Sequence, residues 1–381
     1  MDRSDLLFVS LGGGANRLID TLANTDPRFI PLFINTSITD LQSLDNFNEL
    51  TKNYLCISTQ NGVGRNREIG KQYAEQWGYT ILDTILKHQQ EVIYLVASFG
   101  GGSGSSILST ILKAIDSLKE DGDFNKIINI IGILPDLNSP NVILSNAIDT
   151  WNEVMSYSKC INSMMFIDNN TKLFNTQGNE KEVNINEHFC NLFDSVFSIP
   201  DVNGINFDSG NLGNILTDKG YMTIYDLDQE CSSIEVAYAK AKKESVLASM
   251  FMNESSFVTT ENGELIKCGY WGLSAVTDRY MNNFISSKYK PRRESYIGKN
   301  EEKNLLLISG LLPPFDTITL MEHELASRKD KEKIEEIDFS QFAITKSKDK
   351  TETNNNFNNK ERTSSSNGMK KMKMKKNLFK R

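Results

Sequence analysis

The chain has 381 residues, of which 39% are hydrophobic and 24% charged, and its formal net charge is −7. This length allows two domains with sizeable cores. The sequence contains no run of eighteen apolar residues, so no membrane span is predicted. The start of the chain does not read as a signal peptide. The five cysteines lack CxxC spacing and the three histidines are far apart, which argues against a disulfide framework, a metal site or a Ser-His-Asp triad. We expect a cytoplasmic protein with reduced thiols.

The first element is a strand over Leu6–Ser10, followed at once by glycines and then by a helix carrying Leu18, Ile19 and Leu22. A glycine turn between a strand and a helix lets the backbone approach a phosphate or ribose, and the helix adds the positive end of its dipole. The candidate ligand residues in this turn are Gly12, Gly13, Gly14 and Asn16.

Two further strands end in polar loops. The strand Ile30–Ile34 runs into Asn35, and the strand Tyr54–Ser58 runs into a glycine loop with added positive charge. We predict that Asn35 and four residues of the second loop bind the ligand: Gly62, Gly64, Arg65 and Asn66. One helix from Glu68 to about Trp77 and another to Lys87 are predicted next.

The strongest signal is the heptapeptide GGGSGSS at Gly100–Ser106, between an apolar run at Val92–Phe99 and a helix with an apolar stripe. Linkers of glycine and serine do not lie between a buried strand and an amphipathic helix, so this context favours a phosphate-binding turn. No Lys follows as in a P-loop, and the place and spacing do not suit a dinucleotide fingerprint. The candidates are Gly100, Gly101, Gly102, Ser103, Gly104 and Ser105, and the hydroxyls of Ser103, Ser105 and Ser106 are expected to be donors.

Strands continue to alternate with helices. The apolar run Ile127–Leu134 reads as a strand buried on both faces, and Asp136 and Asn138 in the turn after it are further ligand candidates. A helix and the strand Ser163–Ile167 follow. This rhythm predicts an α/β fold whose doubly wound parallel sheet gathers all the ligand loops at one edge.

Several of these loops resemble those of the tubulin/FtsZ superfamily. GGGSGSS resembles the signature GGGTG[ST]G with Ser103 for Thr and Ser106 for Gly, and INTSITDL resembles an INTD-like turn. The loop from Gly62 to Gly70 resembles GxGxxPxxG with Arg67 in place of the proline. The resemblance implies GTP or GDP as ligand, with Mg²⁺ on the phosphates and no metal site built from the protein alone. Guanine rather than adenine follows from the resemblance only.

The resemblance also implies a long central helix, which we place at Asn186–Ile199. Family members use an Asn or Asp near its start to read the base, and both Asn186 and Asn191 are candidates. Phe189, Phe193 and Phe197 are expected in the core, given their helical spacing.

The segment Asn206–Asn211 resembles the NxDxxD or NxDxxE loop that reaches into the nucleotide site of a neighbouring subunit. Asn206 and Asp208 match, and Asn211 stands where an acidic residue is expected. An amide can hold water but cannot take its proton, so we expect Asp208 to be the main catalytic carboxylate. The alternative interpretation is that Asp208 caps a helix over Leu212–Thr217, and the two roles are compatible.

The second half of the chain predicts a smaller α+β domain. Its elements are a strand at Tyr221–Leu227, a long helix around Ser233–Met252, strands near Leu265–Ala275 and Asn304–Gly310, and a charged helix from Phe315 to about Ile337. The expected divisions are a GTP-binding domain at 1–183, the central helix at 184–200, the second domain at 201–312, a C-terminal helix at 313–344 and a disordered basic tail at 345–381.

The tail differs in charge from the body. Residues 351–381 carry nine Lys or Arg against two Glu, a net +7, which leaves −14 for residues 1–350. Its low-complexity Asn and Ser runs cannot bury a core. Taken alone, the tail suits contact with DNA, a membrane surface or an acidic partner protein.

The basic tail is similar to that of the TubZ group, the plasmid- and phage-borne branch of the superfamily. This implies a GTPase that polymerises head to tail in the cytoplasm of a bacterial host cell. Its tail would engage a DNA-binding adaptor protein on centromere-like DNA, with no membrane partner, and so segregate plasmid or prophage DNA. The alternatives are an FtsZ-like division or phage-positioning filament, or a monomeric nucleotide-binding enzyme with a nucleic-acid-binding tail.

Overall fold

The computed structural model describes residues 1–58, 62–174, 180–181, 184–203, 206–276, 278–299 and 303–331. Met1–Lys333 forms one compact unit, and Ile334–Arg381 is a second unit. The predicted basic tail therefore lies outside the described residues. Within the described ranges, no helix is long and apolar enough to span a bilayer.

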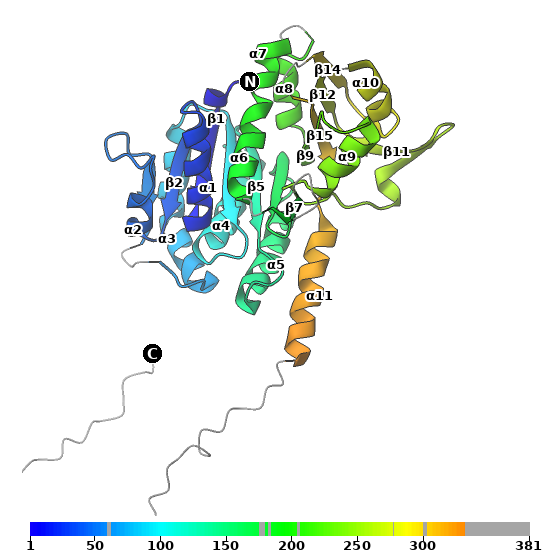
Figure 1. Ribbon diagram of the computed structural model, residues 1–381. Helices are drawn as coiled ribbons and strands as arrows, with labels where there is room; N and C mark the ends of the chain where they lie inside the picture. Colours follow the sequence, from blue (N-terminus) through cyan, green and yellow to red (C-terminus); the bar gives the residue numbers. More distant parts are fainter. Residues whose placement is uncertain are drawn as a thin grey trace, which may run out of the picture. The chain divides into compact units, whose positions relative to one another are not determined.

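One ten-stranded sheet runs through the first unit in the order β14-β12-β15-β9-β6-β5-β4-β1-β2-β3 (Figure 1). Neighbours from β3 through to β9 are parallel, whereas β15 is antiparallel to both β9 and β12. The strands are β1 Leu6–Leu11, β2 Ile30–Asn35, β3 Tyr54–Cys56, β4 Val92–Ser98, β5 Ile127–Leu134, β6 Ser163–Asp168, β9 Gly220–Asp226, β12 Trp271–Ala275, β14 Ser295–Lys299 and β15 Leu305–Leu311. The predicted doubly wound parallel sheet is confirmed.

Two small sheets lie outside the main one. The first has the order β10-β11-β13, with β10 at Phe257–Thr260, β11 at Gly263–Cys268 and β13 at Tyr289–Pro291. The second pairs β7 (Leu173–Phe174) with β8 (Glu180–Lys181). The main sheet passes into the second half of the chain through the pairing of β6 with β9. The predicted internal divisions at 183, 200 and 312 stay predictions.

Helices cover both faces of the main sheet. They are α1 Gly12–Thr25, α2 Ile38–Gln42, α3 Arg67–Lys87, α4 Ser103–Glu120, α5 Asn141–Ser156, α6 Ile185–Val196, α7 Ser198–Asn203, α8 Ser209–Leu216, α9 Ile234–Lys243, α10 Asp278–Ser286 and α11 Phe315–Lys331. Two short 3₁₀ segments lie at Arg3–Asp5 and Glu254–Ser256.

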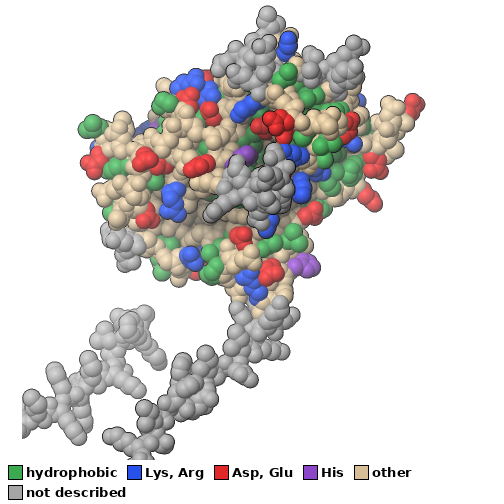
Figure 2. All heavy atoms as spheres, viewed as in Figure 1, with side chains coloured by type: hydrophobic (Ala, Val, Ile, Leu, Met, Phe, Trp, Pro, Cys, Tyr) green, Lys and Arg blue, Asp and Glu red, His purple; other side chains and the backbone are tan. Residues whose placement is uncertain are grey.

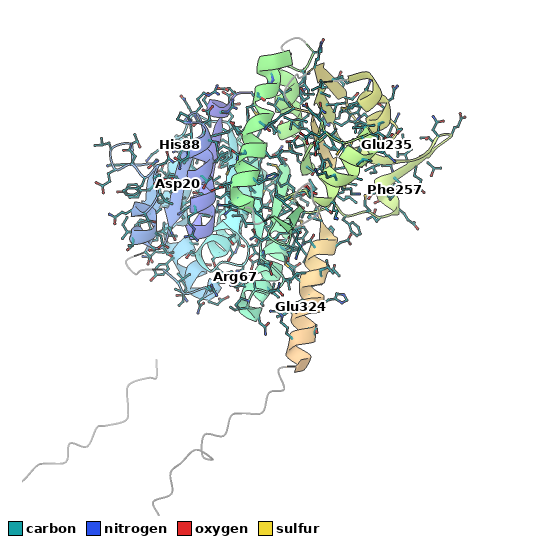
Figure 3. All side chains as sticks on the ribbon, in the orientation of Figure 1. Asp20, Arg67, His88, Glu235, Phe257 and Glu324 are labelled. Carbon is teal, nitrogen blue, oxygen red and sulfur yellow. The ribbon has the colours of Figure 1, made fainter. Side chains whose placement is uncertain are left out.

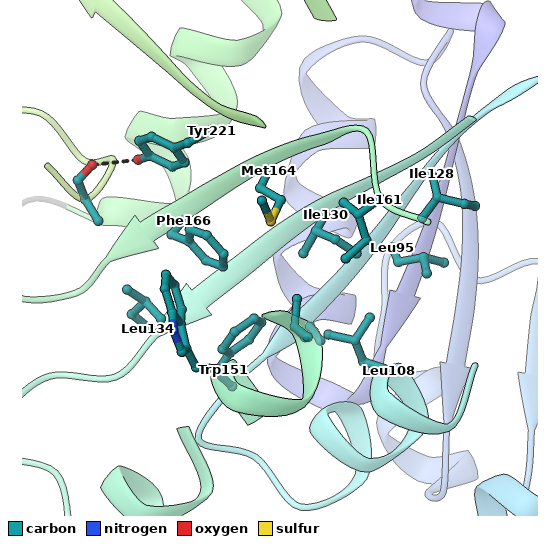
Figure 4. Packing of buried hydrophobic residues seen from close by; sticks show 14 of the residues in the cluster. Leu95, Leu108, Ile128, Ile130, Leu134, Trp151, Ile161, Met164, Phe166 and Tyr221 are labelled. Atoms are coloured by element: carbon teal, nitrogen blue, oxygen red, sulfur yellow. Dashed lines mark hydrogen bonds between the residues drawn. The ribbon is translucent and has the colours of Figure 1, made fainter. Parts of the chain in front are cut away.

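Alternation along β1 assigns the two faces, since successive strand residues point to opposite sides. Leu7 and Val9 belong to a core with residues of α3, α4 and α5, whereas Leu6 and Phe8 belong to a core with residues of α1, α6 and α8. Figure 4 shows part of the first core, with Leu108 and Trp151 packed against the strands. Burying each such side chain stabilises the folded state by about 1.5–3 kcal/mol relative to leaving it exposed to water.

The central helix packs on α1, and its aromatic side chains belong to the adjoining core. Phe189, Phe193 and Phe197 are buried, as predicted, and Phe193 meets Phe8 edge to face at 5.9 Å between ring centroids. The predicted single helix over 186–199 is interrupted, because α6 ends at Val196 and α7 begins at Ser198. Pro200 lacks the N–H that would bond to the carbonyl of Val196, which explains the break.

Two other predicted helices differ from those observed. α3 is one continuous helix, because burying Ile81 and Ile85 outweighs the cost of about 1 kcal/mol for Gly78 within it. The predicted helix 233–252 ends at Lys243. Beyond it, Val246 and Ala248 form backbone hydrogen bonds with β6, and Tyr221 donates to the carbonyl of Ala248 at 2.6 Å (Figure 4).

The predicted strand around Leu265–Ala275 is divided into β11 and β12 by Gly269 and Tyr270. The predicted C-terminal helix is observed as α11 over Phe315–Lys331, where it packs on α5. On the face shown in Figure 2, acidic and basic side chains of the described residues are intermixed.

Candidate functional site

The two glycine turns lie against each other after β1 and β4, which are neighbours in the sheet. Gly12 begins α1 with a φ of +79°, and a Cβ there would lie 2.8 Å from the backbone nitrogen of Gly104. A Cβ on Gly104 would lie 2.1 Å from the carbonyl oxygen of Leu11. These two positions therefore need glycine because backbone meets backbone, which is a different reason from the ligand approach that the sequence suggested.

Gly100 and Gly102 also face protein. A Cβ on Gly100 would lie 2.4 Å from the side chain of Ile143 in α5, and one on Gly102 would lie 2.6 Å from the Cα of Arg65. Gly13 is different, because the nearest atom to a Cβ there is a carboxylate oxygen of Asp40 at 3.5 Å. The surface of the turns that has room for a ligand is formed by half-buried residues: Gly13, Gly14, Gly101 and Ser103.

The helix ends behind this surface suit an anion. α1 and α4 both begin at these turns, so their first free amides and positive dipole ends point toward the same edge of the sheet. A phosphate at this place would replace water on donors that the fold leaves without intrahelical partners.

The three hydroxyls of the signature do not have equal access. Ser103 is half-buried, and its hydroxyl lies 2.7 Å from that of Thr36. Ser105 and Ser106 are fully buried, and their hydroxyls donate to the carbonyls of Gly101 and Gly102 at 2.5 and 2.7 Å. The expectation of three available hydroxyl donors is therefore corrected to Ser103 alone.

Asn16 and Asn35 are buried beside the first turn. The amide of Asn16 contacts the hydroxyl of Ser10 at 2.8 Å and points into the protein. The Asn35 oxygen accepts the backbone N–H of Thr36 at 2.8 Å, and its nitrogen lies 3.8 Å from a Cβ position on Gly13. Of the two, Asn35 is the one next to the open surface.

The loop after β3 has an unusual backbone. Gly62, Gly64 and Arg65 have φ values of +86°, +56° and +65°, and Arg65 is exposed. Asn66 is the N-cap of α3, because its side-chain oxygen accepts the backbone N–H groups of Glu68 and Ile69. This role occupies the oxygen of Asn66 and leaves its amide nitrogen for a ligand.

The turn between β5 and α5 is held by hydrogen bonds within it and from two other segments. Asp136 accepts the backbone N–H of Asn138 at 2.6 Å, and Asn170 accepts that of Leu137 at 2.7 Å. Arg328 of α11 donates to the carbonyl of Ser139 at 2.6 Å and also to that of Leu137. Asp136 is half-buried and Asn138 exposed, at the same edge of the sheet as the glycine turns.

The two asparagines of α6 lie at different levels. The thiol of Cys190 lies 3.5 Å from the carbonyl oxygen of Leu18, in the middle of α1. The carboxylate of Asp194 accepts a hydrogen bond of 2.6 Å from the Nε of Arg3, which precedes β1. α6 therefore runs away from the glycine turns, and Asn186 in its first turn lies nearer to them than Asn191 does. Asn186 is half-buried and Asn191 is exposed.

Asp208 lies at the opposite edge of the sheet. It precedes α8, and Ser209 accepts the N-terminal ammonium of Met1 at 2.6 Å. A groove of about 640 Å³ joins Ser209 and Gly210 to Val92 and Ile127, the first residues of β4 and β5. Figure 1 shows α8 beside the N-terminus. Because β5 spans eight residues, the two edges are about 25 Å apart.

A capping box holds Asp208. One of its oxygens accepts the backbone N–H of Asn211 at 2.8 Å, and the Asn211 side chain accepts the backbone N–H of Asp208 at 3.0 Å. Asn206 and Asp208 are exposed. The predicted cap is therefore present, and it leaves the second carboxylate oxygen of Asp208 without a hydrogen bond to the described residues.

No group of three His, Cys, Asp or Glu within the described ranges is arranged to hold a metal ion. The groove nearest the turns, about 740 Å³, is lined by three basic and three acidic side chains and does not select an anion. The case for phosphate therefore rests on the helix ends and the glycine turns rather than on groove volume.

Residues 7–177 match the Tubulin/FtsZ family, GTPase domain. This part of the chain is similar to the GTPase domain of the tubulin/FtsZ family. It is 28% identical over 340 residues to the tubulin-like protein TubZ of Clostridium botulinum C phage, covering 87% of this chain and 86% of that protein. The structure of Clostridium botulinum phage c-st TubZ with its C-terminal tail truncated superposes with a TM-score of 0.73 at 26% identity, covering 86% of this chain and 99% of that one.

A more distant structure has the same fold. It is a GTPγS-form protofilament of Bacillus thuringiensis serovar israelensis TubZ, with a TM-score of 0.66 at 14% identity, covering 87% of this chain and 94% of that one. The match over residues 7–177 and the likeness to TubZ confirm the recognition made from the glycine loops.

Arg67 stands where the loop pattern that Gly62–Gly70 resembles has a proline. Its side chain is buried and pairs with Glu153 of α5, a contact between residues 86 positions apart. Burial alone would raise the pKa of Glu153, but hydrogen bonds from Ser109 and Lys71 and the charge of Arg67 hold that pKa below its usual range. Sequence reasoning noted Arg67 only as a substitution.

Other residues that the sequence did not single out are Thr36, Asp40, Asn146 and Glu153. Asp40 lies beside Gly13, and Asn146 donates to the carbonyl of Arg65 at 3.1 Å. The polar turn of Thr36 and Asp40 after a strand was a usable signal. Nothing local distinguishes Asn146 or Glu153 from other polar residues of an amphipathic helix.

Proposed function

We propose that this chain is a GTPase that polymerises head to tail, with hydrolysis at each nucleotide completed by Asp208 of the next subunit. The observation that carries the proposal is the separation of Asp208 from the glycine turns by the length of the sheet. A nucleotide at the turns is out of reach of Asp208 in the same chain. In a head-to-tail stack, one edge of the sheet faces the opposite edge of the next copy.

In this proposal the phosphates lie over the first turns of α1 and α4, with Gly13, Gly101 and Ser103 at the contact surface. Arg65 lies toward the terminal phosphate, and Asn186, rather than Asn191, reads the base. Mg²⁺ bound to phosphate oxygens and water would neutralise charge on the leaving group, and Asp40 is the carboxylate best placed to orient one of its waters.

Asp208 would act on the attacking water. Its uncapped carboxylate oxygen is exposed and can accept a proton or hold the water in line with the terminal phosphate. Asn211 holds Asp208 through the capping box, and Asn206 lies on the same exposed loop. Hydrolysis then requires polymer contact, so the nucleotide in a free subunit would persist.

Sedimentation with different nucleotides tests this function. We expect the full-length chain to pellet with GTP and with a slowly hydrolysed GTP analogue, and to remain in the supernatant with GDP or ATP. Phosphate release should rise more steeply than in proportion to protein concentration, since each active site needs two subunits. A chain that hydrolyses GTP while staying monomeric would contradict the head-to-tail proposal and favour a monomeric enzyme.

We further propose that the filament segregates plasmid or prophage DNA in the cytoplasm of a bacterial host cell. The support is the similarity to TubZ together with the charge of the tail, which carries seven Lys or Arg in its last fourteen residues. A basic segment outside the folded unit can dock an acidic surface of a DNA-bound adaptor protein, in a way that weakens with salt.

Deleting Gly368–Arg381 should separate the two functions. We expect GTP hydrolysis and pelleting to stay within about twofold of the full-length chain, because the deleted residues lie outside the unit Met1–Lys333. We expect retention of the DNA element to be lost in dividing cells. The measurements are phosphate release, pelleting and the fraction of cells that keep the DNA. A truncated chain that no longer pellets would make the tail a filament element, and stable inheritance without the tail would argue for a division or phage-positioning role.

A further inference from the structure

The side chain of Arg67 joins three helices at the candidate site. It is 7% exposed, and Figure 3 shows it among the helices at the glycine-turn end of the sheet. Its Nε donates to the hydroxyl of Ser105 in α4 at 3.2 Å, and its guanidinium forms an ion pair with Glu153 in α5. The hydroxyl of Ser105 donates in turn to the carbonyl of Gly101. Arg67 is therefore connected through the Ser105 hydroxyl to the signature turn, Gly100–Ser106.

The backbone of Arg67 makes a second connection to α4. Its carbonyl oxygen lies 2.8 Å from the hydroxyl oxygen of Ser106, and it shares that hydroxyl as a donor with the carbonyl of Gly102. Close packing accompanies this bond, since a Cβ on Gly70 would lie 2.7 Å from the same hydroxyl oxygen. The start of α3 is thus fixed against the start of α4.

α5 supports both loops from the other side. Asn146, about two turns before Glu153, donates to the carbonyl of Arg65 at 3.1 Å and contacts those of Gly100 and Gly101 at 3.4 and 3.5 Å. One face of α5 therefore holds the loop 62–66 and the signature turn together.

The loop 62–66 needs such support. Arg65 has a left-handed backbone conformation, which costs a residue with a Cβ roughly 1–2 kcal/mol. Gly62 and Gly64 on either side of it also have positive φ, and a Cβ on either would meet nothing within 4 Å. A loop with open space around its glycines and a strained residue keeps one conformation only if neighbouring groups impose it.

We propose that Arg67, Glu153 and Ser105 form a clamp that fixes the loop 62–66 against the signature turn, and that this clamp makes the site prefer GTP over GDP. The inference rests on the proposed function, in which Arg65 lies toward the terminal phosphate. GTP would contact the loop, whereas GDP would contact only the glycine turns. A loop already held in place loses little entropy when GTP binds, and a free loop must be ordered at that moment.

Arg67 is a positioning residue in this scheme, because it is buried and acts through Ser105 and the loop. Its pairing with Glu153 is well suited to replacement, since a buried ion pair can often be exchanged for apolar side chains with little loss of stability. The hydroxyls of Ser105 and Ser109 keep acceptors of their own in the carbonyls of Gly101 and Ser105. No buried donor is left unpaired by the exchange.

The test variant is Arg67→Met with Glu153→Leu in the full-length chain. A matched control is Arg3→Met with Asp194→Leu. The side chains of Arg3 and Asp194 are 6% and 28% exposed, close to the 7% and 30% of Arg67 and Glu153. The control pair lies at the edge of the sheet away from the glycine turns. Calorimetry at a concentration below assembly would give the dissociation constants for GTP and GDP.

We expect the preference for GTP over GDP to fall about tenfold in the test variant, with GDP affinity unchanged, and to stay constant in the control. An unchanged preference in a folded test variant would overturn the clamp. An equal loss for both nucleotides would do so too, because it would indicate general damage to the turns. If the double variant does not fold, Glu153→Gln keeps the shape and removes the charge, and the same preference should fall by a smaller factor.

Hydrogen exchange without nucleotide separates this inference from the proposed function. We expect faster exchange of the backbone amide of Asn66 in the test variant and no change there in the control. A wild-type chain that binds no guanine nucleotide would end the proposed function and with it the GTP preference. Equal exchange in the test variant and wild type would show instead that Arg67 and Glu153 do not hold the loop.

Discussion

Replacing Asp208 by Asn should slow GTP hydrolysis by roughly 10²- to 10⁴-fold, the usual contribution of a general base. Asn is as good an N-cap as Asp, so α8 keeps its capping box and the fold should be unaffected. The glycine turns lie about 25 Å away, and GTP affinity should therefore not change. Filaments should form and persist, because the nucleotide in them remains GTP. Phosphate release and the lifetime of the pelleted polymer measure the effect.

Complementation between two inactive variants decides whether Asp208 acts across a contact. The partner should carry Gly13→Ala, which keeps Asp208 and is expected to lose nucleotide binding. At a mixed contact, intact Asp208 of the partner would face GTP bound by the Asp208→Asn subunit. We expect hydrolysis in the mixture and none in either variant alone. A mixture as inactive as its components, or an Asp208→Asn variant that fails to bind GTP, would place Asp208 outside a shared site.

Gly104→Ala should abolish nucleotide binding by deforming both glycine turns. The added Cβ would lie 2.1 Å from the carbonyl oxygen of Leu11, so the backbone of one turn must move away from the other. Such overpacking costs about 1–3 kcal/mol. We expect a lower melting temperature together with loss of GTP binding and of pelleting. Thermal unfolding and calorimetry on the same preparation measure the two effects.

Gly13→Ala is the matched variant that separates fold from ligand. Its Cβ would have no neighbour nearer than 3.5 Å, and its φ is not in the left-handed region. Replacing glycine by alanine in a helix usually stabilises by about 0.5–1 kcal/mol. We therefore expect an equal or higher melting temperature with much weaker GTP binding, because the methyl group occupies the surface where phosphate would lie. Normal affinity in this variant would remove Gly13 from the site.

Local patterns were sufficient for the first half of the fold. The strands before Gly12 and Gly100, and the helices after them, follow from apolar runs and from glycine, both of which act through near neighbours in the chain. Parallel strands joined by helices leave few arrangements, so the edge of the sheet at which the loops gather could also be predicted. The recognition of the family rested on these same loops.

Contacts between distant residues decided the rest. The signature hydroxyls of Ser105 and Ser106 are buried where the start of α3 packs against them, and Arg67 pairs with Glu153 across 86 positions. The helix expected to reach Met252 ends at Lys243, because Val246 and Ala248 form backbone hydrogen bonds with β6 instead of continuing the helix. Helical periodicity records which face of a segment is apolar, but not which partner will cover it. The sequence alone therefore determined the chemistry at the ends of the strands, and only the tertiary structure decided which groups hold the loops and which are left to face a ligand.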